Sequence, residues 1–177
     1  QQVDTPQNLY DKPVNLFVAG FIGTPQMNFV DCEVEEDNGE IFLNFGNSSV
    51  KLPADKANDP MVKDYIGKEV IMGIRPECIS DDPKFIEANP GGVIETDVEV
   101  TELMGAEIYL YLIANRVVVD EELASKKNMV IDKSVEQKLT ARVSPRSQAR
   151  TGDTIRVAID TERVHIFDKD TEKCIIH

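Results

Sequence analysis

The first 25 residues carry a helical pattern that differs from the rest of the chain. Thr5 is a suitable cap for a short helix with Pro6 at its first position, and Asn15 is a suitable cap for a second helix. Nearly every residue from Leu16 to Ile22 is apolar, and Gly23 follows as a stop signal. A helix that is apolar on all sides needs cover on more than one side.

After residue 25 the apolar positions recur with a period of two, which predicts strands. Strands are expected over residues 29–35, 40–45, 49–52, 93–103 and 108–113. Asn38-Gly39 joins the first two as a typical hairpin turn, and residues 104–107 form the turn between the last two. The stretch 53–67 combines turn residues with a few apolar anchors and predicts a loop with one helical turn.

One internal repeat stands out, because residues 67–79 align without gaps on residues 152–164. Each copy has a turn glycine, an alternating apolar strand, and then a glutamate with an aliphatic residue. Regular short strands with turn signals favour a barrel over a parallel α/β sheet. We therefore predict a mainly β fold of tandem, duplicated OB-like barrel modules with a short helical N-terminal segment.

The composition limits the classes of partner. Among 177 residues, 32 are acidic and 19 basic, so the net charge of -13 disfavours nucleic acid and anionic membrane surfaces. Aromatic residues make up 6% and tryptophan is absent, which does not fit the stacking platforms of proteins that bind single strands. No apolar run approaches the ~20 residues of a membrane span. The first residues lack both an initiator Met and a signal peptide, so we expect the chain to begin inside a longer gene product.

The sequence offers no recognisable catalytic or metal site. No segment matches GxxxxGK[ST], so ATP cleavage through a P-loop and a bound cofactor are not expected in this chain. His165 lies between two aliphatic residues and is expected to be a partly buried strand residue, while His177 is the last residue. The three cysteines fit neither a disulfide framework nor a zinc site and favour a reducing compartment: Cys32, Cys78 and Cys174.

Three clusters of charge are given structural interpretations. Arg75-Pro76-Glu77 predicts a corner at a strand end, where Arg75 and Glu77 contact backbone groups or a neighbouring subunit. The arginines 142, 146 and 150 are expected to be solvated or to contact an acidic partner. The alternating acids Asp31, Glu33 and Glu35 predict a solvated strand face.

Four segments resemble the ATP-binding subunits of maltose and multiple-sugar ABC importers. They occur in the family's order and span nearly the whole chain: residues 8–29, 72–77, 98–107 and 152–168. The first resembles the junction between the nucleotide-binding and regulatory domains. Cys78 stands where relatives usually carry His, and residues 35–64 and 115–138 show no family signature.

The resemblance implies a division at residue 25. Residues 1–25 would be the helical tail of a nucleotide-binding domain and the junction, and residues 26–177 a regulatory transport-associated OB (TOBE) domain without catalytic activity. The full-length protein would be a carbohydrate-transporting ATPase that uses ATP and Mg²⁺. It would be cytoplasmic, forming a homodimer and lying against transporter membrane subunits at the inner face of the membrane, where a regulatory protein can bind.

The resemblance also supplies candidate residues. Those of the domain junction are Phe17, Phe21, Pro25, Met27, Asn28 and Phe29. Those of a regulatory or dimer surface are Arg75, Pro76, Glu77, Gly105, Glu107, Glu162 and His165. The alternative function is a small-ligand sensor, because related OB-like modules bind oxyanions; its candidate sites lie around Arg75 or around residues 144–147.

Overall fold

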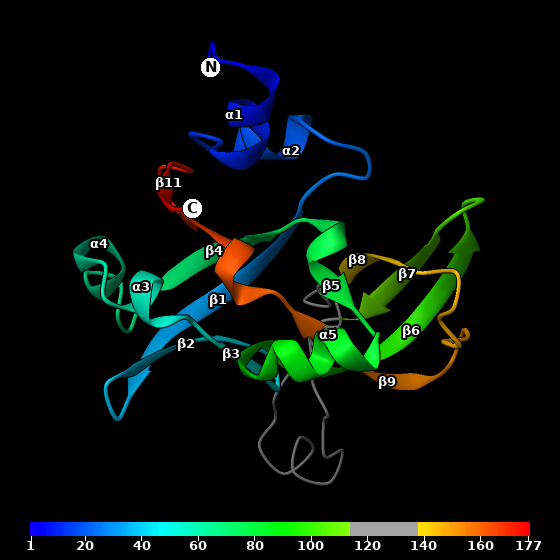
Figure 1. Cartoon of the computed structure of the whole chain (residues 1–177). Helices are drawn as coiled ribbons and strands as arrows, with labels where there is room; N and C mark the ends of the chain where they lie inside the picture. The colour runs from blue at the N-terminus through cyan, green and yellow to red at the C-terminus, as the bar shows by residue number, and fades with distance from the viewer. Residues whose placement is uncertain (114–137) are drawn as a thin grey trace, which may run out of the picture.

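The computed structural model describes residues 1–113 and 138–177 (Figure 1). Its two opening helices are α1 (Pro6–Asp11) and α2 (Leu16–Phe21). The side chains of Thr5 and Asn15 cap them, each accepting a hydrogen bond from the backbone N–H three residues further on. Both predicted caps are thus confirmed, and the two helices together, residues 5–22, are called the helical segment.

Two antiparallel sheets make up the rest of the fold, called the β body. The first has the order β11-β10-β4-β1-β2-β3 and the second β5-β9-β6-β7-β8. The strands of the first are β1 (Asn28–Asp37), β2 (Glu40–Phe45), β3 (Ser48–Lys51), β4 (Glu69–Ile74), β10 (His165–Asp168) and β11 (Cys174–Ile176). Those of the second are β5 (Ile79–Ser80), β6 (Val93–Leu103), β7 (Ile108–Ile113), β8 (Lys138–Val143) and β9 (Thr154–Ile159).

The turn between β1 and β2 forms as its sequence predicts. Asn38 and Gly39 have φ of 50° and 79°, the left-handed geometry of a two-residue hairpin. Along β1 the acids at positions 31, 33 and 35 are exposed while the residues between them are buried. The alternation therefore places one face of this strand in the core and the other in solvent, as expected.

The internal repeat appears in the structure as an exchange of strands. In one copy β4 leads through the 3₁₀ turn η1 (Pro76–Cys78) to β5, which pairs with β9. In the other, β9 leads through η4 (Thr161–Arg163) to β10, which pairs with β4. The two copies are 85 residues apart, so Gly73 corresponds to Ala158 and Ser80 to His165. The pairs Ser80↔Ala158 and His165↔Gly73 are therefore equivalent. Each copy therefore completes the sheet of the other, and the duplicated OB-like fold is confirmed.

The connections contain more helix than the sequence predicted. Residues 53–67 form two short helices, α3 (Ala54–Ala57) and α4 (Pro60–Lys63), so the expectation of one turn was wrong. The second begins because Asp59 caps it, accepting from Met61 N at 2.8 Å. A further helix, α5 (Pro83–Ala88), begins after Asp82 in the same way and precedes the 3₁₀ turn η2 (Pro90–Gly92). Within the described ranges, every helix is too short to cross a membrane.

One continuous hydrophobic core joins the two sheets. It includes buried residues from both sheets, among them Ile41, Met72, Leu110 and Ile159. A smaller second cluster lies between the helical segment and the first sheet. Figure 1 shows the helical segment on one side of the β body, close to β11.

Candidate functional site

Arg75 fastens the helical segment to the β body. Its side chain is 3% exposed and follows directly after β4. Nη1 donates to the carbonyl oxygens of Ile22 at 2.5 Å and Ala19 at 3.3 Å, and Nη2 donates to that of Tyr10 at 2.8 Å. The first two are carbonyls at the end of α2, where no further helical turn provides donors. A buried cation therefore satisfies and electrostatically complements this helix end.

Tyr10 makes the corresponding contacts from the helical segment, and the set Arg75, Glu77 and Tyr10 is called the clamp. The Arg75 guanidinium carbon lies 3.9 Å from the centre of its ring, a cation–π contact, and its hydroxyl donates to a carboxylate oxygen of Glu77. Pro76 is buried between them. The triplet 75–77 thus forms a structural corner, as predicted, and its two charged residues each bind the helical segment.

A small apolar cluster supports the same contact. Ala19 of α2 packs with Met27 and Phe167, and the ring of Phe29 meets that of Phe167 edge to face at a centroid distance of 6.0 Å. Gly73 makes room for this packing, since a Cβ there would lie 2.6 Å from the Met27 sulfur and 2.8 Å from the Phe167 ring. One face of α2 is therefore buried against the first sheet.

The opposite face of α2 is exposed. Phe17 and Phe21 are 59% and 74% exposed, and their rings stack with centroids 5.8 Å apart and planes 8° apart. The sequence predicted an apolar helix that needs cover on more than one side, and the described residues cover one. The remaining aromatic pair is available to another surface.

Asn28 links the two sheets. Its Nδ2 donates to the carbonyl oxygens of Ile74 at 3.1 Å and Thr140 at 2.9 Å, and its Oδ1 accepts from Thr140 N at 2.7 Å. The side chain is buried, so these bonds form away from water. Of the other junction candidates, Met27 is buried, and Pro25 and Phe29 are half-buried.

Three of the predicted surface residues are inside the molecule. Arg75, Pro76 and His165 are buried, so they cannot present side chains to a partner, and their assignment to a surface is corrected. The others are accessible: Gly105 and Glu162 are exposed, and Glu77 and Glu107 are half-buried. Burial arises from contacts between distant segments, which the local sequence pattern does not report.

The hairpin between β6 and β7 carries an apolar surface that the sequence reasoning missed. Val100, Leu103 and Met104 are exposed, with Leu103 at 81%. Gly105 turns the chain with φ of 76°, and Glu107, the last residue of the turn, forms an ion pair with Arg142 at 3.6 Å. The signal was present in the sequence, since apolar residues directly flank a turn glycine on a strand otherwise rich in acids.

His165, Cys174 and His177 form a cluster beside Arg75 and Tyr10: His165 lies in β10, Cys174 in β11, and His177 directly after β11. His165 Nδ1 is 3.3 Å from His177 Nδ1, which is 3.4 Å from Cys174 Sγ. Burial, with the nearby charges of His177 and Lys56, lowers the pKa of His165 to about 3, and burial also lowers the pKa of His177. Burial raises the pKa of the Cys174 thiol to about 12. The sequence reasoning missed this cluster; the spacing Cys174-x-x-His177 was the available signal.

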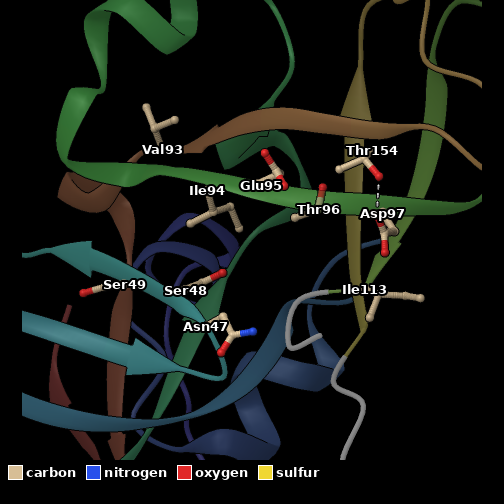
Figure 2. A pocket seen from close by; sticks show the side chains of 10 residues that line it. All are labelled: Asn47, Ser48, Ser49, Val93, Ile94, Glu95, Thr96, Asp97, Ile113 and Thr154. Carbon is tan, nitrogen blue, oxygen red and sulfur yellow. Dashed lines mark hydrogen bonds between the residues drawn. The ribbon is translucent and has the colours of Figure 1, made fainter. Parts of the chain in front are cut away.

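Two cavities bear on oxyanion binding. The first, about 300 Å³, lies between the β2–β3 turn and β6 (Figure 2); the described residues that line it include Glu95 and Asp97, with no lysine or arginine among them. Thr154 donates to Asp97 at 2.6 Å, and the buried hydroxyl of Thr96 has no partner among the described residues. The carboxylates of Glu95 and Asp97 oppose an anion there.

The second cavity, about 530 Å³, adjoins the predicted oxyanion segment 144–147. Arg146 and Arg156 line it, together with the carboxylates Asp81, Asp82 and Asp153. Ser147 already donates to Asp81 at 2.5 Å. At the other predicted position, the terminal nitrogens of Arg75 are bound to carbonyl oxygens. The segment 115–138, which shows no family signature, falls outside the described residues except for Lys138.

Comparison with known proteins agrees with this architecture. Residues 23–79 match the family model of the MalK OB-fold domain. The oligosaccharides import ATP-binding protein MsmX of Bacillus subtilis is 35% identical over 172 residues, covering 97% of this chain and 40% of the relative. The trehalose/maltose import ATP-binding protein MalK of Thermococcus litoralis is 36% identical over 177 residues, covering 99% and 41%.

The chain thus spans about two fifths of the length of these relatives. The cytoplasmic molybdate-binding protein ModG, solved with molybdate bound, overlaps with a TM-score of 0.48 and 10% identity over 80% of this chain and 94% of that one, which is too low to bear on function. Residues 23–79 therefore belong to the MalK OB-fold domain family, and nearly the whole chain is similar to about two fifths of sugar-import ATP-binding proteins.

Proposed function

We propose that this chain is the non-catalytic regulatory and dimerisation part of an ATP-binding subunit that powers carbohydrate import. In this proposal residues 1–25 join it to an upstream nucleotide-binding domain, which binds ATP and Mg²⁺, and residues 26–177 form the regulatory domain. The full-length protein would act as a homodimer at the cytoplasmic face of the membrane, against the transporter's membrane subunits, and could receive a regulatory protein.

The two-sided character of α2 carries the proposal. One face is held by Arg75 and the cluster around Ala19, while Phe17 and Phe21 project from the other. Burying each phenylalanine is worth about 1.5–3 kcal/mol, so a second domain seated on this pair would gain substantially. The length of the relatives leaves about three fifths of their chains for such a domain.

The dimer contact is proposed to involve the β6–β7 hairpin. Its apolar residues Val100, Leu103 and Met104 project beside the surface candidates Gly105 and Glu107. A two-fold axis there would place the same patch of both copies together. The net charge of -13 opposes this approach, and salt screens that repulsion.

A chimera tests the proposal. This chain replaces the 172 aligned residues of the MsmX relative, and phosphate release is measured for the chimera and for the chain alone. We expect ATP hydrolysis from the chimera and none from the chain. Changing Phe17 and Phe21 to serine should detach the two domains of the chimera and expose the junction to protease. ATP turnover by the chain that survives repurification, or a junction unaffected by the double change, would overturn the proposal.

An oxyanion sensor is the second candidate, favoured by Arg146 and Arg156 around the second cavity and opposed by the three carboxylates there. Calorimetry with molybdate, sulfate and phosphate distinguishes the two functions. Micromolar binding that is lost in Arg146→Ala would favour the sensor.

A further inference from the structure

We propose that His165, Cys174 and His177 form a zinc-binding site at the join between β10 and β11. Their ligand atoms, Nδ1, Sγ and Nδ1, all lie within 4.8 Å of one another. Two imidazoles and a thiolate are ligands that zinc commonly takes in proteins.

The distances match a tetrahedral metal. With Zn–N bonds of about 2.0–2.1 Å and Zn–S bonds of about 2.3 Å, tetrahedral angles separate two nitrogens by about 3.3 Å and a nitrogen from a sulfur by about 3.6 Å. The corresponding distances here are 3.3 Å between the imidazole nitrogens and 3.4 Å between Cys174 Sγ and His177 Nδ1. The third distance, from Cys174 Sγ to His165 Nδ1, is within 4.8 Å, so a zinc ion would draw these two side chains together along that edge.

The surrounding structure holds these residues in place. His165 lies in β10 opposite Gly73 of β4, and Cys174 lies in β11 opposite Phe167. The backbone N–H of Cys174 donates to Val14 O at 2.9 Å, so the site also contacts the helical segment. Ligands that are fixed before the metal arrives lose little conformational freedom on binding it.

Lys56 braces the same region from α3. Its buried ammonium donates to Val164 O at 3.0 Å and to His177 O, the backbone oxygens beside one ligand and of another. Its hydrogens are therefore directed at carbonyls. Its positive charge opposes a divalent ion, and the thiolate and the neighbouring Glu162 and Asp11 offset that charge.

Zinc binding would displace one proton from the cluster. Each histidine turns Nδ1 towards the other, so zinc needs the tautomers in which Nε2 carries the proton and both Nδ1 atoms have a free electron pair. Cys174 would bind as its thiolate. Binding would form an S–Zn bond, break the S–H bond and release the proton to water. No electron is transferred, because zinc keeps its oxidation state.

With three protein ligands, a tetrahedral zinc ion would keep a fourth coordination position for water or a small ligand. His165 and His177 line a cavity of about 260 Å³ that also meets Tyr10 and Arg75 of the clamp. The ion would therefore close the β10–β11 hairpin next to the contact that holds the helical segment. We expect zinc to slow hydrogen exchange in the helical segment as well as at β11.

The test uses the whole chain after removal of metals by a chelator. Calorimetry with ZnCl₂ should give one ion per chain with a micromolar or lower dissociation constant, and Co²⁺ should give the near-ultraviolet thiolate band and the visible bands of a tetrahedral site. His177→Ala, at an exposed position, should weaken zinc at least about tenfold, since loss of an outer-shell partner alone costs that much. Cys174→Ser should remove the thiolate band.

Cys32→Ala is the matched control, because Cys32 lies in β1 and is absent from the cluster. It should keep the stoichiometry and the cobalt spectrum, and circular dichroism checks that each variant is folded. Absence of binding up to 100 µM ZnCl₂ would overturn the site and leave a hydrogen bond between the two imidazoles. Binding that His177→Ala retains at full strength would also overturn it, even if Cys174→Ser does not fold.

Discussion

Replacing Arg75 with alanine should release the helical segment while the β body stays folded. The change removes three hydrogen bonds from a charged donor, to Tyr10, Ala19 and Ile22, and the cation–π contact with Tyr10. Each such bond is worth about 1.5–3 kcal/mol before the cost of burying the charge. The buried Arg75 Nε, which has no acceptor among the described residues, adds to that cost.

We therefore expect a net loss of about 3 kcal/mol in the free energy that docks the helical segment, or roughly a 100-fold rise in its undocked population. Hydrogen–deuterium exchange measures this directly, because Leu16 N and Ile22 N are bonded only while the segment is docked and helical. Their exchange should accelerate roughly 100-fold, with β6 and β7 unchanged. Arg163→Ala, at an exposed position of the other repeat copy, is the control. Unchanged exchange in Arg75→Ala would refute the clamp.

Three further predictions concern the β body and the exposed face of α2. Asn28→Ala should lower the free energy of unfolding by about 2–3 kcal/mol in urea, because it leaves the backbone of Thr140 unpaired; an unchanged midpoint would refute the link between the sheets. Changing Phe17 and Phe21 to serine should alter the stability of the isolated chain by less than about 1 kcal/mol in a thermal melt, since both rings are exposed, and a larger loss would mean that the chain itself covers them. In the metal-free chain the pKa of His165 is lowered to about 3, so between pH 6.5 and 3 the unfolded chain binds a proton that the folded chain does not, and the free energy of unfolding should decrease as the pH falls across this window by up to about 1.4 kcal/mol per unit. His165→Gln should flatten this slope, and an unchanged slope would contradict the assignment.

Local sequence signals were sufficient to predict the secondary-structure elements, but not to predict which strands pair with one another. The Asn38-Gly39 hairpin and the strand limits at 93–103 and 108–113 follow from residue type and period, and all appear in the structure. The 85-residue repeat predicted two related modules. Which strand pairs with which depends on contacts between distant segments, so the exchange of β5 and β10 could not be read from either copy alone.

In the candidate site, too, local conformation was predictable from the sequence, whereas contacts between distant segments were not. The Arg75-Pro76-Glu77 corner was predicted from the conformational effect of Pro76, but the burial of Arg75 depends on helices more than 50 residues away in sequence. Lys56 is buried because carbonyls from the other end of the chain meet it, and no local pattern reports this. In contrast, the second helix of residues 53–67 was predictable, because Asp59-Pro60 is a typical helix start.

Sedimentation equilibrium tests the proposed dimerisation most directly. The chain is measured at micromolar concentrations in low and moderate salt, beside Leu103→Asp at the tip of the β6–β7 hairpin. We predict a monomer–dimer equilibrium that weakens at low salt, because the charge of -13 is screened over about 8 Å at physiological ionic strength but over about 30 Å at 0.01 M. Leu103→Asp should shift it to monomer. A monomer at every concentration would contradict the dimerisation role, and stronger association at low salt would contradict its electrostatic part.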